Sequence, residues 1–184
     1  MSKSIAVLVG SLRRDSLSRK TAKAIASLAP AGLTFELVPI GDLPFYNEDL
    51  ETSSPPPQWT EFRTRIKKAD GLLFVTPEYN RSVPAALKNA LDVGSRPYGS
   101  NVFNGKPGAV VSISMGALGG FGANHHLRQS LVFLNVPTLP HEAYIGSAHT
   151  LFDAEGQLTN ENTEKFLRDF GVKLERWLET RSAS

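Results

Sequence analysis

Hydroxyl groups and one guanidinium are concentrated in the segment from Gly10 to Ser18. The polar residues that could bind a ligand there are Ser11, Arg13, Ser16 and Ser18. The segment follows an apolar stretch typical of a β-strand and precedes a helical pattern. Glycine permits a tight turn, free amides at a helix N-terminus and serine hydroxyls donate hydrogen bonds, and arginine keeps its charge. These residue types in this order predict a site for a phosphate group.

The same segment lacks the glycine spacing of the common nucleotide-binding loops. Ser11 and Leu12 follow Gly10 where a dinucleotide fingerprint has further glycines, and the Gly-Lys-Ser/Thr ending of a triphosphate loop is missing. A terminal monophosphate suits these donors, because each charge-assisted hydrogen bond contributes about 1.5–3 kcal/mol. Taken alone, the segment is also compatible with a serine-rich helix cap and an incidental arginine.

The composition limits the class of protein. The chain has 184 residues, of which 41% are hydrophobic and 21% charged, so we expect one globular domain over residues 1–184. The net charge of +2 does not favour nucleic acid as a partner, and no apolar stretch approaches the ~20 residues of a membrane span. Because no signal peptide is evident, we expect a cytoplasmic protein.

The chain contains no cysteine. This excludes disulfides, thiol catalysis and iron–sulfur ligation, so any redox chemistry must depend on a bound organic cofactor. His125 and His126 are adjacent, and neighbours in a helix point about 100° apart, which does not make a chelating pair. We therefore expect no metal site.

Short apolar runs alternate with helical patterns along the whole chain. The expected strands cover residues 5–9, 33–37, 71–75, 108–113 and 136–139. The expected helices cover residues 17–28, 59–69, 84–91, 123–134 and 166–177. Five such units predict an α/β fold with a doubly wound parallel sheet. Ligands of such sheets bind beyond the carboxyl ends of the strands, so we expect the loops at Gly10, Pro77 and Gly116 to converge on one rim.

Several motifs together carry a resemblance to a known family. They are Gly10–Arg13, Pro77–Asn80, Leu87–Asn89, Ser114–Gly116 and Phe152–Leu158. In this combination the chain closely resembles the NAD(P)H-dependent FMN reductase family, which includes soluble quinone and chromate reductases. The resemblance implies a flavodoxin-like fold, with five parallel strands in the order 2-1-3-4-5, helices on both faces and non-covalently bound FMN.

The resemblance also implies which residues bind the cofactor. Those around the FMN phosphate would be Ser11, Arg13, Ser16 and Ser18. Those near its ring system would be Pro77, Glu78, Tyr79, Asn80, Ser82, Ser114, Met115, Gly116 and Gly119. Gly119 and Gly120 would let a nicotinamide or a flat substrate approach the backbone closely. The chain departs from the family pattern at Ser18, where relatives usually have asparagine, and at Val93, where they often have tryptophan.

The activity implied by the family is hydride transfer from NADPH or NADH to FMN and then to an acceptor. Acceptors would be quinones, free flavin, azo compounds or metal oxyanions such as chromate. No side chain is expected to transfer a catalytic proton: Glu78 has the chemistry of an acid or base, but hydride transfer requires alignment rather than a titrating group. Arg14 and Arg81 are candidates to contact the 2′-phosphate of NADPH.

The family further implies a homodimer or homotetramer.

Two alternative functions remain open from the residues alone. A flavodoxin-type electron carrier would bind FMN without its own substrate turnover, but carriers present an acidic docking face that a chain of net charge +2 lacks. A non-catalytic regulator that kept the fold would bind no flavin.

Overall fold

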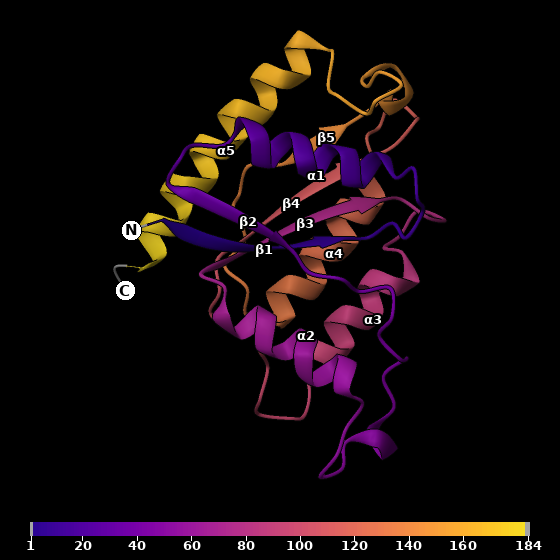
Figure 1. Cartoon of the computed structure of the whole chain (residues 1–184), viewed down its shortest axis with the longest axis vertical. Coiled ribbons are helices and arrows are strands. Elements are labelled where there is room, and N and C mark those ends of the chain that lie inside the picture. Colours follow the sequence, from indigo (N-terminus) through magenta and orange to yellow (C-terminus); the bar gives the residue numbers. More distant parts are fainter. Residues whose placement is uncertain (1, 183–184) are drawn as a thin grey trace.

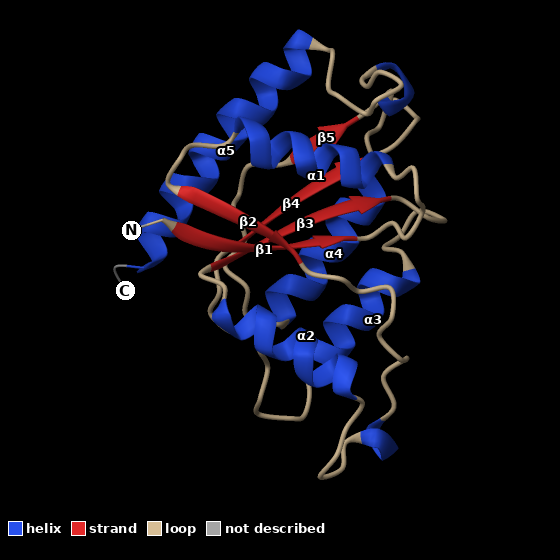
Figure 2. Cartoon of the chain, viewed as in Figure 1, coloured by secondary structure: helices blue, strands red, loops and turns tan. Residues whose placement is uncertain are grey.

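The computed structural model describes residues 2–182 as a central parallel sheet between two layers of helices (Figures 1 and 2). The strands are β1 (Lys3–Val9), β2 (Leu33–Leu37), β3 (Gly71–Pro77), β4 (Gly108–Ile113) and β5 (Ala143–Ile145). Their order is β2-β1-β3-β4-β5 and every pairing is parallel. The predicted flavodoxin-like fold and strand order are therefore confirmed.

The helices cover both faces of the sheet. They are α1 (Leu17–Leu28), α2 (Pro57–Lys68), α3 (Ala85–Gly94), α4 (Phe121–Phe133) and α5 (Glu161–Ser182), with short 3₁₀ turns at Glu48–Leu50 and Ala148–Thr150. Helices α1 and α5 pack on one face, and α2, α3 and α4 on the other (Figure 1). None of the helices within residues 2–182 combines the length and hydropathy needed to span a bilayer.

The two faces of the sheet bury separate apolar clusters. Central strands are buried throughout, because helices cover both of their faces. Trp59, in the first turn of α2, is fully buried in the cluster under that helix. Trp177 is half-buried and its Nε1 donates to the carbonyl of Pro137 at 3.0 Å. The sheet is thereby fixed between two rigid layers.

The predicted fifth strand at residues 136–139 is wrong. That segment forms one isolated bridge, between Thr138 and Gly108, and the strand that extends the sheet is β5. Pro137 and Pro140 have no amide hydrogen, which prevents a regular ladder across this segment. Pairing resumes after the second proline.

The strands end at nearly the same level. Val9 of β1 pairs with Val75 of β3, and Thr76 of β3 pairs with Ser112 of β4. The loops that follow these three strands therefore begin side by side at one edge of the sheet, toward the right in Figure 1. This is the rim at which the sequence places the site.

Candidate functional site

A cavity of about 290 Å³ lies where the loops after β1, β3 and β4 meet. Its walls include the predicted residues Ser11, Arg13, Ser16, Ser18, Pro77, Glu78, Tyr79, Ser114 and Met115. Leu17 and Ile113 also line it, and sequence reasoning missed both. Their only sequence signal is position, at the first residue of a helix and the last residue of a strand. The predicted loops do converge on one cavity.

The β1–α1 loop (residues 10–16) presents donors around the N-terminus of α1. Ser16 is the N-cap, and its hydroxyl accepts a hydrogen bond from the amide of Arg19 at 3.1 Å. The Ser11 hydroxyl accepts one from the amide of Arg13 at 3.4 Å. The hydroxyl of Ser18 has no hydrogen-bond partner among residues 2–182, and because no buried side-chain polar atom there lacks a partner, this hydroxyl reaches the cavity surface. Amides, hydroxyls and a guanidinium thus surround one wall of the cavity.

The charge of this wall suits an anion. The first turn of α1 contains no acidic residue, and Arg13 forms no salt bridge within the described chain. The nearby carboxylate of Asp15 forms an ion pair with Lys20 at 2.6 Å, so its negative charge is compensated. That hydrogen bond and the charge of Lys20 lower the pKa of Asp15 below its usual value. A helix N-terminus with these donors fits a phosphate group.

The β3–α3 loop (residues 78–84) contains a tight turn. The amide of Tyr79 donates to the carbonyl of Ser82 at 3.0 Å, and the amide of Ser82 donates back at 2.9 Å. Asn80 and Arg81 both adopt left-handed backbone conformations, with φ of 50° and 63°. Such conformations are costly for residues other than glycine and persist where surrounding structure fixes them. The turn is therefore held in one shape beside the cavity.

Glu78 connects this turn to α4. Its Oε2 accepts a hydrogen bond from the amide of Ala123 at 3.1 Å, in the first turn of a helix that has no side-chain cap of its own. Its Oε1 pairs with Arg81 at 3.3 Å. A Cβ at Gly122 would lie 2.7 Å from the Arg81 carbonyl oxygen, so only glycine permits this approach. The Glu78 carboxylate thus caps α4 and positions the turn.

The β4–α4 loop (residues 114–120) contains Gly119 and Gly120, which were expected to allow a flat ligand to approach the backbone. In the structure both glycines pack against the protein itself. Gly119 has a φ of 59°, and a Cβ there would lie 2.7 Å from the amide nitrogen of Ile145 in β5. Gly120, with a φ of 76°, packs similarly against Ser112. These glycines are buried against the protein's own strands, so fold geometry already requires them. A Cβ at Gly116 would meet only the Ser114 hydroxyl, at 3.8 Å, and Met115 beside it is 63% exposed.

Four predicted residues lie outside the cavity walls: Asn80, Ser82, Gly116 and Gly119. The hydroxyl of Ser82 is hydrogen-bonded to Nδ1 of His126 at 2.9 Å, which links the turn to α4 a second time. His126 had no expected role. No group of three or more His, Cys, Asp or Glu within residues 2–182 could hold a metal ion.

Asn89 of the Leu-Lys-Asn motif does not line the cavity and instead binds the backbone of residues 43–46. The side chain is buried, and its Nδ2 donates to the carbonyls of Leu43 and Pro44, both at 3.2 Å. Its Oδ1 accepts from the amide of Tyr46 at 2.8 Å. This motif therefore anchors the long loop that follows β2. The neighbouring Lys88 forms an exposed i,i+4 pair with Asp92 at 2.7 Å.

The strand order and the polar cavity at the carboxyl ends define a flavodoxin-like protein with a phosphate-binding rim. The chain belongs to the NADPH-dependent FMN reductase family, whose model matches residues 4–150. It is accordingly an oxidoreductase that uses FMN and a reduced nicotinamide dinucleotide.

Proteins of known sequence and structure support this family assignment. The chain is 56% identical to a quinone reductase of Pseudomonas putida over 181 residues, which covers 98% of this chain and 97% of that protein. It is 46% identical to a 2-hydroxy-1,4-benzoquinone reductase of a Burkholderia species, with 98% and 99% covered. Among solved structures, FerB of Paracoccus denitrificans, a flavoenzyme NAD(P)H:(acceptor) oxidoreductase, superimposes with a TM-score of 0.90 at 42% identity, covering 97% of this chain and 98% of that one.

Proposed function

We propose that the protein reduces quinones with electrons from NADPH or NADH, through FMN bound in the cavity at the carboxyl edge of the sheet. The observation that carries this proposal is the meeting of Ser11, Arg13 and Ser18 with the β3–α3 and β4–α4 loops around one cavity. The two quinone reductases with which the chain shares 56% and 46% identity support the choice of acceptor. Free flavin, azo compounds and chromate remain predicted acceptors of the same open site.

The phosphate would be held by the β1–α1 loop. Arg13 would supply the charge, Ser11 and Ser18 would supply hydroxyl donors, and the first amides of α1 would donate to the anion. Ser16 caps the helix and so keeps those amides in position. Serine at position 18 reaches less far than the asparagine expected there, but its hydroxyl forms no hydrogen bond within residues 2–182 and lies on the cavity wall.

The ring system would lie against the other two loops. FMN, when bound, accepts a hydride from the nicotinamide and delivers electrons to the acceptor. The protein would bind and orient the ring system. Pro77 and Tyr79 form one wall of the cavity, and Ser114 and Met115 form another. Asn80 lies on the fixed turn next to these walls, with Gly116 on the facing loop.

Glu78 and Ser82 would affect the flavin ring by fixing the backbone beside it, and neither would transfer a proton. Glu78 binds the first turn of α4 and Ser82 binds His126 of the same helix. Both links hold backbone amides of the turn in fixed directions. Fixed donors near a ring that gains negative charge stabilise that charge without reorganisation.

We further propose that the protein is a cytoplasmic homodimer or homotetramer. A cavity of about 810 Å³ lies between α3, the loop after it and α4. Its rim carries Tyr98 and Phe133, which are 94% and 89% exposed. Large exposed apolar side chains around a hollow are typical of protein interfaces. A monomeric mass by light scattering at micromolar concentration would reject this assembly.

The function is tested by mixing the FMN-loaded protein with NADPH or NADH without air and following flavin absorbance, then adding 1,4-benzoquinone. We expect rapid bleaching, followed by recovery of the yellow colour with formation of one hydroquinone for each reduced flavin that is reoxidised. An unbleached flavin would instead indicate an electron carrier. Protein that takes up no FMN at all would indicate a regulator that kept only the fold.

A further inference from the structure

A second cavity lies on the outer side of α1. It has a volume of about 410 Å³ and is enclosed by α1, residues 155–158 and the first turns of α5. We call it the α1 groove. It shares only Ser16 with the cavity assigned to FMN, so the two lie on different sides of the start of α1. The FMN site proposed above does not use it.

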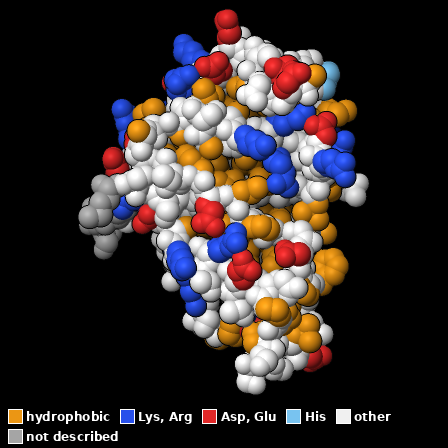
Figure 3. Space-filling model, in the orientation of Figure 1, with side chains coloured by type: hydrophobic (Ala, Val, Ile, Leu, Met, Phe, Trp, Pro, Cys, Tyr) orange, Lys and Arg blue, Asp and Glu red, His pale blue; other side chains and the backbone are white. Residues whose placement is uncertain are grey.

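Basic side chains dominate the α1 groove. Arg14, Arg19, Lys20 and Lys23 line it, and Figure 3 shows blue side chains gathered over α1. Lys20 is paired with Asp15 at 2.6 Å. The remaining three cations form no ion pair with any residue from 2 to 182. Like charges along one helix destabilise it unless an anion lies among them.

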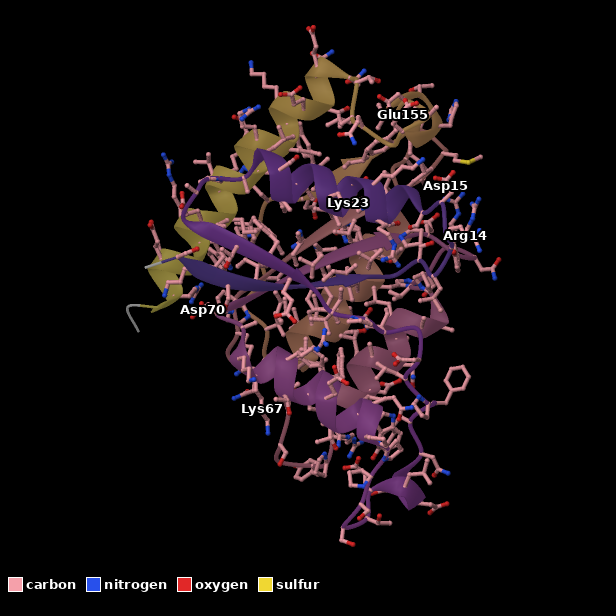
Figure 4. The ribbon with its side chains drawn as sticks, viewed as in Figure 1. Arg14, Asp15, Lys23, Lys67, Asp70 and Glu155 are labelled. Carbon is pink, nitrogen blue, oxygen red and sulfur yellow. The ribbon has the colours of Figure 1, made fainter. Side chains whose placement is uncertain are left out.

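Two carboxylates lie on the opposite side of the groove. Glu164 is paired with Arg168 at 2.8 Å, which neutralises it. Glu155 has no ion-pair partner within the described chain, and Figure 4 shows it on the loop that faces Lys23 and Arg14. Within residues 2–182, the groove therefore combines three cations and one carboxylate that form no ion pair. Its net positive charge suits a phosphate, and the carboxylate can accept hydrogen bonds from a polar group attached to that phosphate.

The wall formed by residues 152–158 is preorganised. Phe152 and Leu158 form a bridge, and Oδ1 of Asp153 accepts a hydrogen bond from the amide of Gln157 at 2.7 Å. Gly156 has a φ of 82°, and a Cβ there would lie 3.2 Å from Cε of Lys20. The turn thus packs on the aliphatic stem of Lys20. This explains in physical terms the Phe152–Leu158 motif that the FMN site does not use.

We propose that the α1 groove binds the phosphate end of a nucleotide. Arg14, Arg19 and Lys23 would bind the phosphate, and Glu155 would accept hydrogen bonds from ribose or base. The base of the groove contains Ala24, Leu28 and Leu158, which give the nucleoside an apolar surface. The volume lies within the range of about 300–1,000 Å³ typical of small-molecule sites.

Two sources can supply this chemistry: the 2′-phosphate end of NADPH and a free mononucleotide. The first rests on the proposed function, because NADPH must then be the electron donor. The second is independent of turnover. A binding measurement on the FMN-loaded protein addresses the site itself, and steady-state kinetics separates the sources.

The test compares R14Q/K23Q with K67Q/K68Q. The control removes the same two charges from exposed positions on α2, in the opposite helical layer. Calorimetric titration with adenosine 2′-monophosphate and with adenosine is carried out on each FMN-loaded protein. We expect the nucleotide to bind more tightly than adenosine, R14Q/K23Q to weaken it by about 10- to 100-fold, and the control to match the wild type.

Two results would overturn the proposal: equal affinity for nucleotide and nucleoside, or equal losses in the two double variants. If binding falls only in R14Q/K23Q, the KM values identify the source. A raised KM for NADPH with an unchanged KM for NADH indicates the co-substrate, and unchanged KM values indicate a free nucleotide. Because calorimetry needs no turnover, the effect of R14Q/K23Q on nucleotide affinity could still be interpreted if the protein did not reduce quinones.

Discussion

The two edges of the sheet use polar side chains in different ways. At the amino edge, the amide and hydroxyl of Ser4 both donate to Oδ2 of Asp70, at 2.7 and 3.0 Å. Lys106 donates through Nζ to the carbonyls of Lys67 and Ala69, at 3.0 and 2.7 Å, and so caps α2. Figure 4 labels Asp70 and Lys67 at this edge, far from Arg14. Here the protein satisfies its own polar groups.

At the carboxyl edge, comparable groups face the cavity instead. Ser18 keeps its hydroxyl without a partner in the described chain, and Arg13 keeps its guanidinium without a carboxylate. No buried side-chain polar atom among residues 2–182 lacks a partner, so the Ser18 hydroxyl reaches the cavity surface. A hydroxyl and a guanidinium exposed there are available to a ligand, as the proposed phosphate site requires. The difference between the edges separates polar residues that stabilise the fold from those proposed to bind FMN.

The largest effect is expected at a glycine of the carboxyl edge. Gly119→Ala should reduce the free energy of unfolding by about 3 kcal/mol, because the left-handed backbone and the 2.7 Å approach to Ile145 each oppose a Cβ. Gly116→Ala is the matched control in the same loop, since its nearest neighbour is 3.8 Å away. Urea unfolding measures both. Equal losses would mean that the loop does not pack on β5 as described.

Arg13→Ala should weaken FMN binding by about 10- to 100-fold, the value of one charge-assisted contact. Arg176→Ala, at an exposed position on α5, is the control for loss of an arginine. Fluorescence titration of the apo-protein gives both dissociation constants. An unchanged constant for Arg13→Ala would remove Arg13 from the site and weaken the contrast between the edges.

Two substitutions at Glu78 test whether its carboxylate caps α4 or transfers a proton. Glu78→Ala should cost about 1 kcal/mol of unfolding free energy and slow flavin reduction, because the amide of Ala123 loses its acceptor. Glu78→Gln keeps an acceptor oxygen and should recover most of both properties. If Gln is as impaired as Ala and the pH profile of turnover changes, the carboxylate takes part in proton transfer.

The smallest effect is expected at the amino edge. The hydrogen bond from the Ser4 amide holds the pKa of Asp70 below its usual value of 3.8. A lowered pKa in the folded state stabilises the protein above pH 3.8, and this contribution is lost as pH falls through the folded pKa. Asp70→Asn should therefore cost less than about 1 kcal/mol at pH 7, because the site is exposed, and the difference should shrink in acid.

Asp70→Asn should leave FMN affinity unchanged. This is the counterpart of the Arg13 experiment at the other edge of the same sheet. A loss of FMN affinity comparable to that of Arg13→Ala would show that the two edges are not functionally separate. Urea midpoints at pH 7 and pH 3, together with one FMN titration, are sufficient.

The fold could largely be read from the chain, because apolar runs and helical spacing are local signals. Gly108–Ile113 was predicted with its observed bounds, and Leu17–Leu28 likewise. The fifth strand was misplaced because Val136 and Leu139 are buried and apolar without belonging to a strand. The observed β5 has only three residues, too few to show a period.

The site was predicted at its loops but not in its internal links. Motif residues placed the cavity, whereas the bonds from Glu78 to Ala123 and from Ser82 to His126 join positions more than forty residues apart. No local pattern reports such contacts. The packing of Gly119 against β5 is likewise visible only in the structure, and its role in ligand binding stays a prediction.

The central claim is that the start of α1 binds the phosphate of FMN, and the most direct test is to compare FMN with riboflavin. The two ligands share a ring system and differ by that phosphate. Titration of the apo-protein should give a dissociation constant for FMN lower by about 100-fold or more, as expected for several charge-assisted bonds. In Arg13→Ala the ratio should shrink. Equal affinity of the wild-type protein for both ligands would contradict the account.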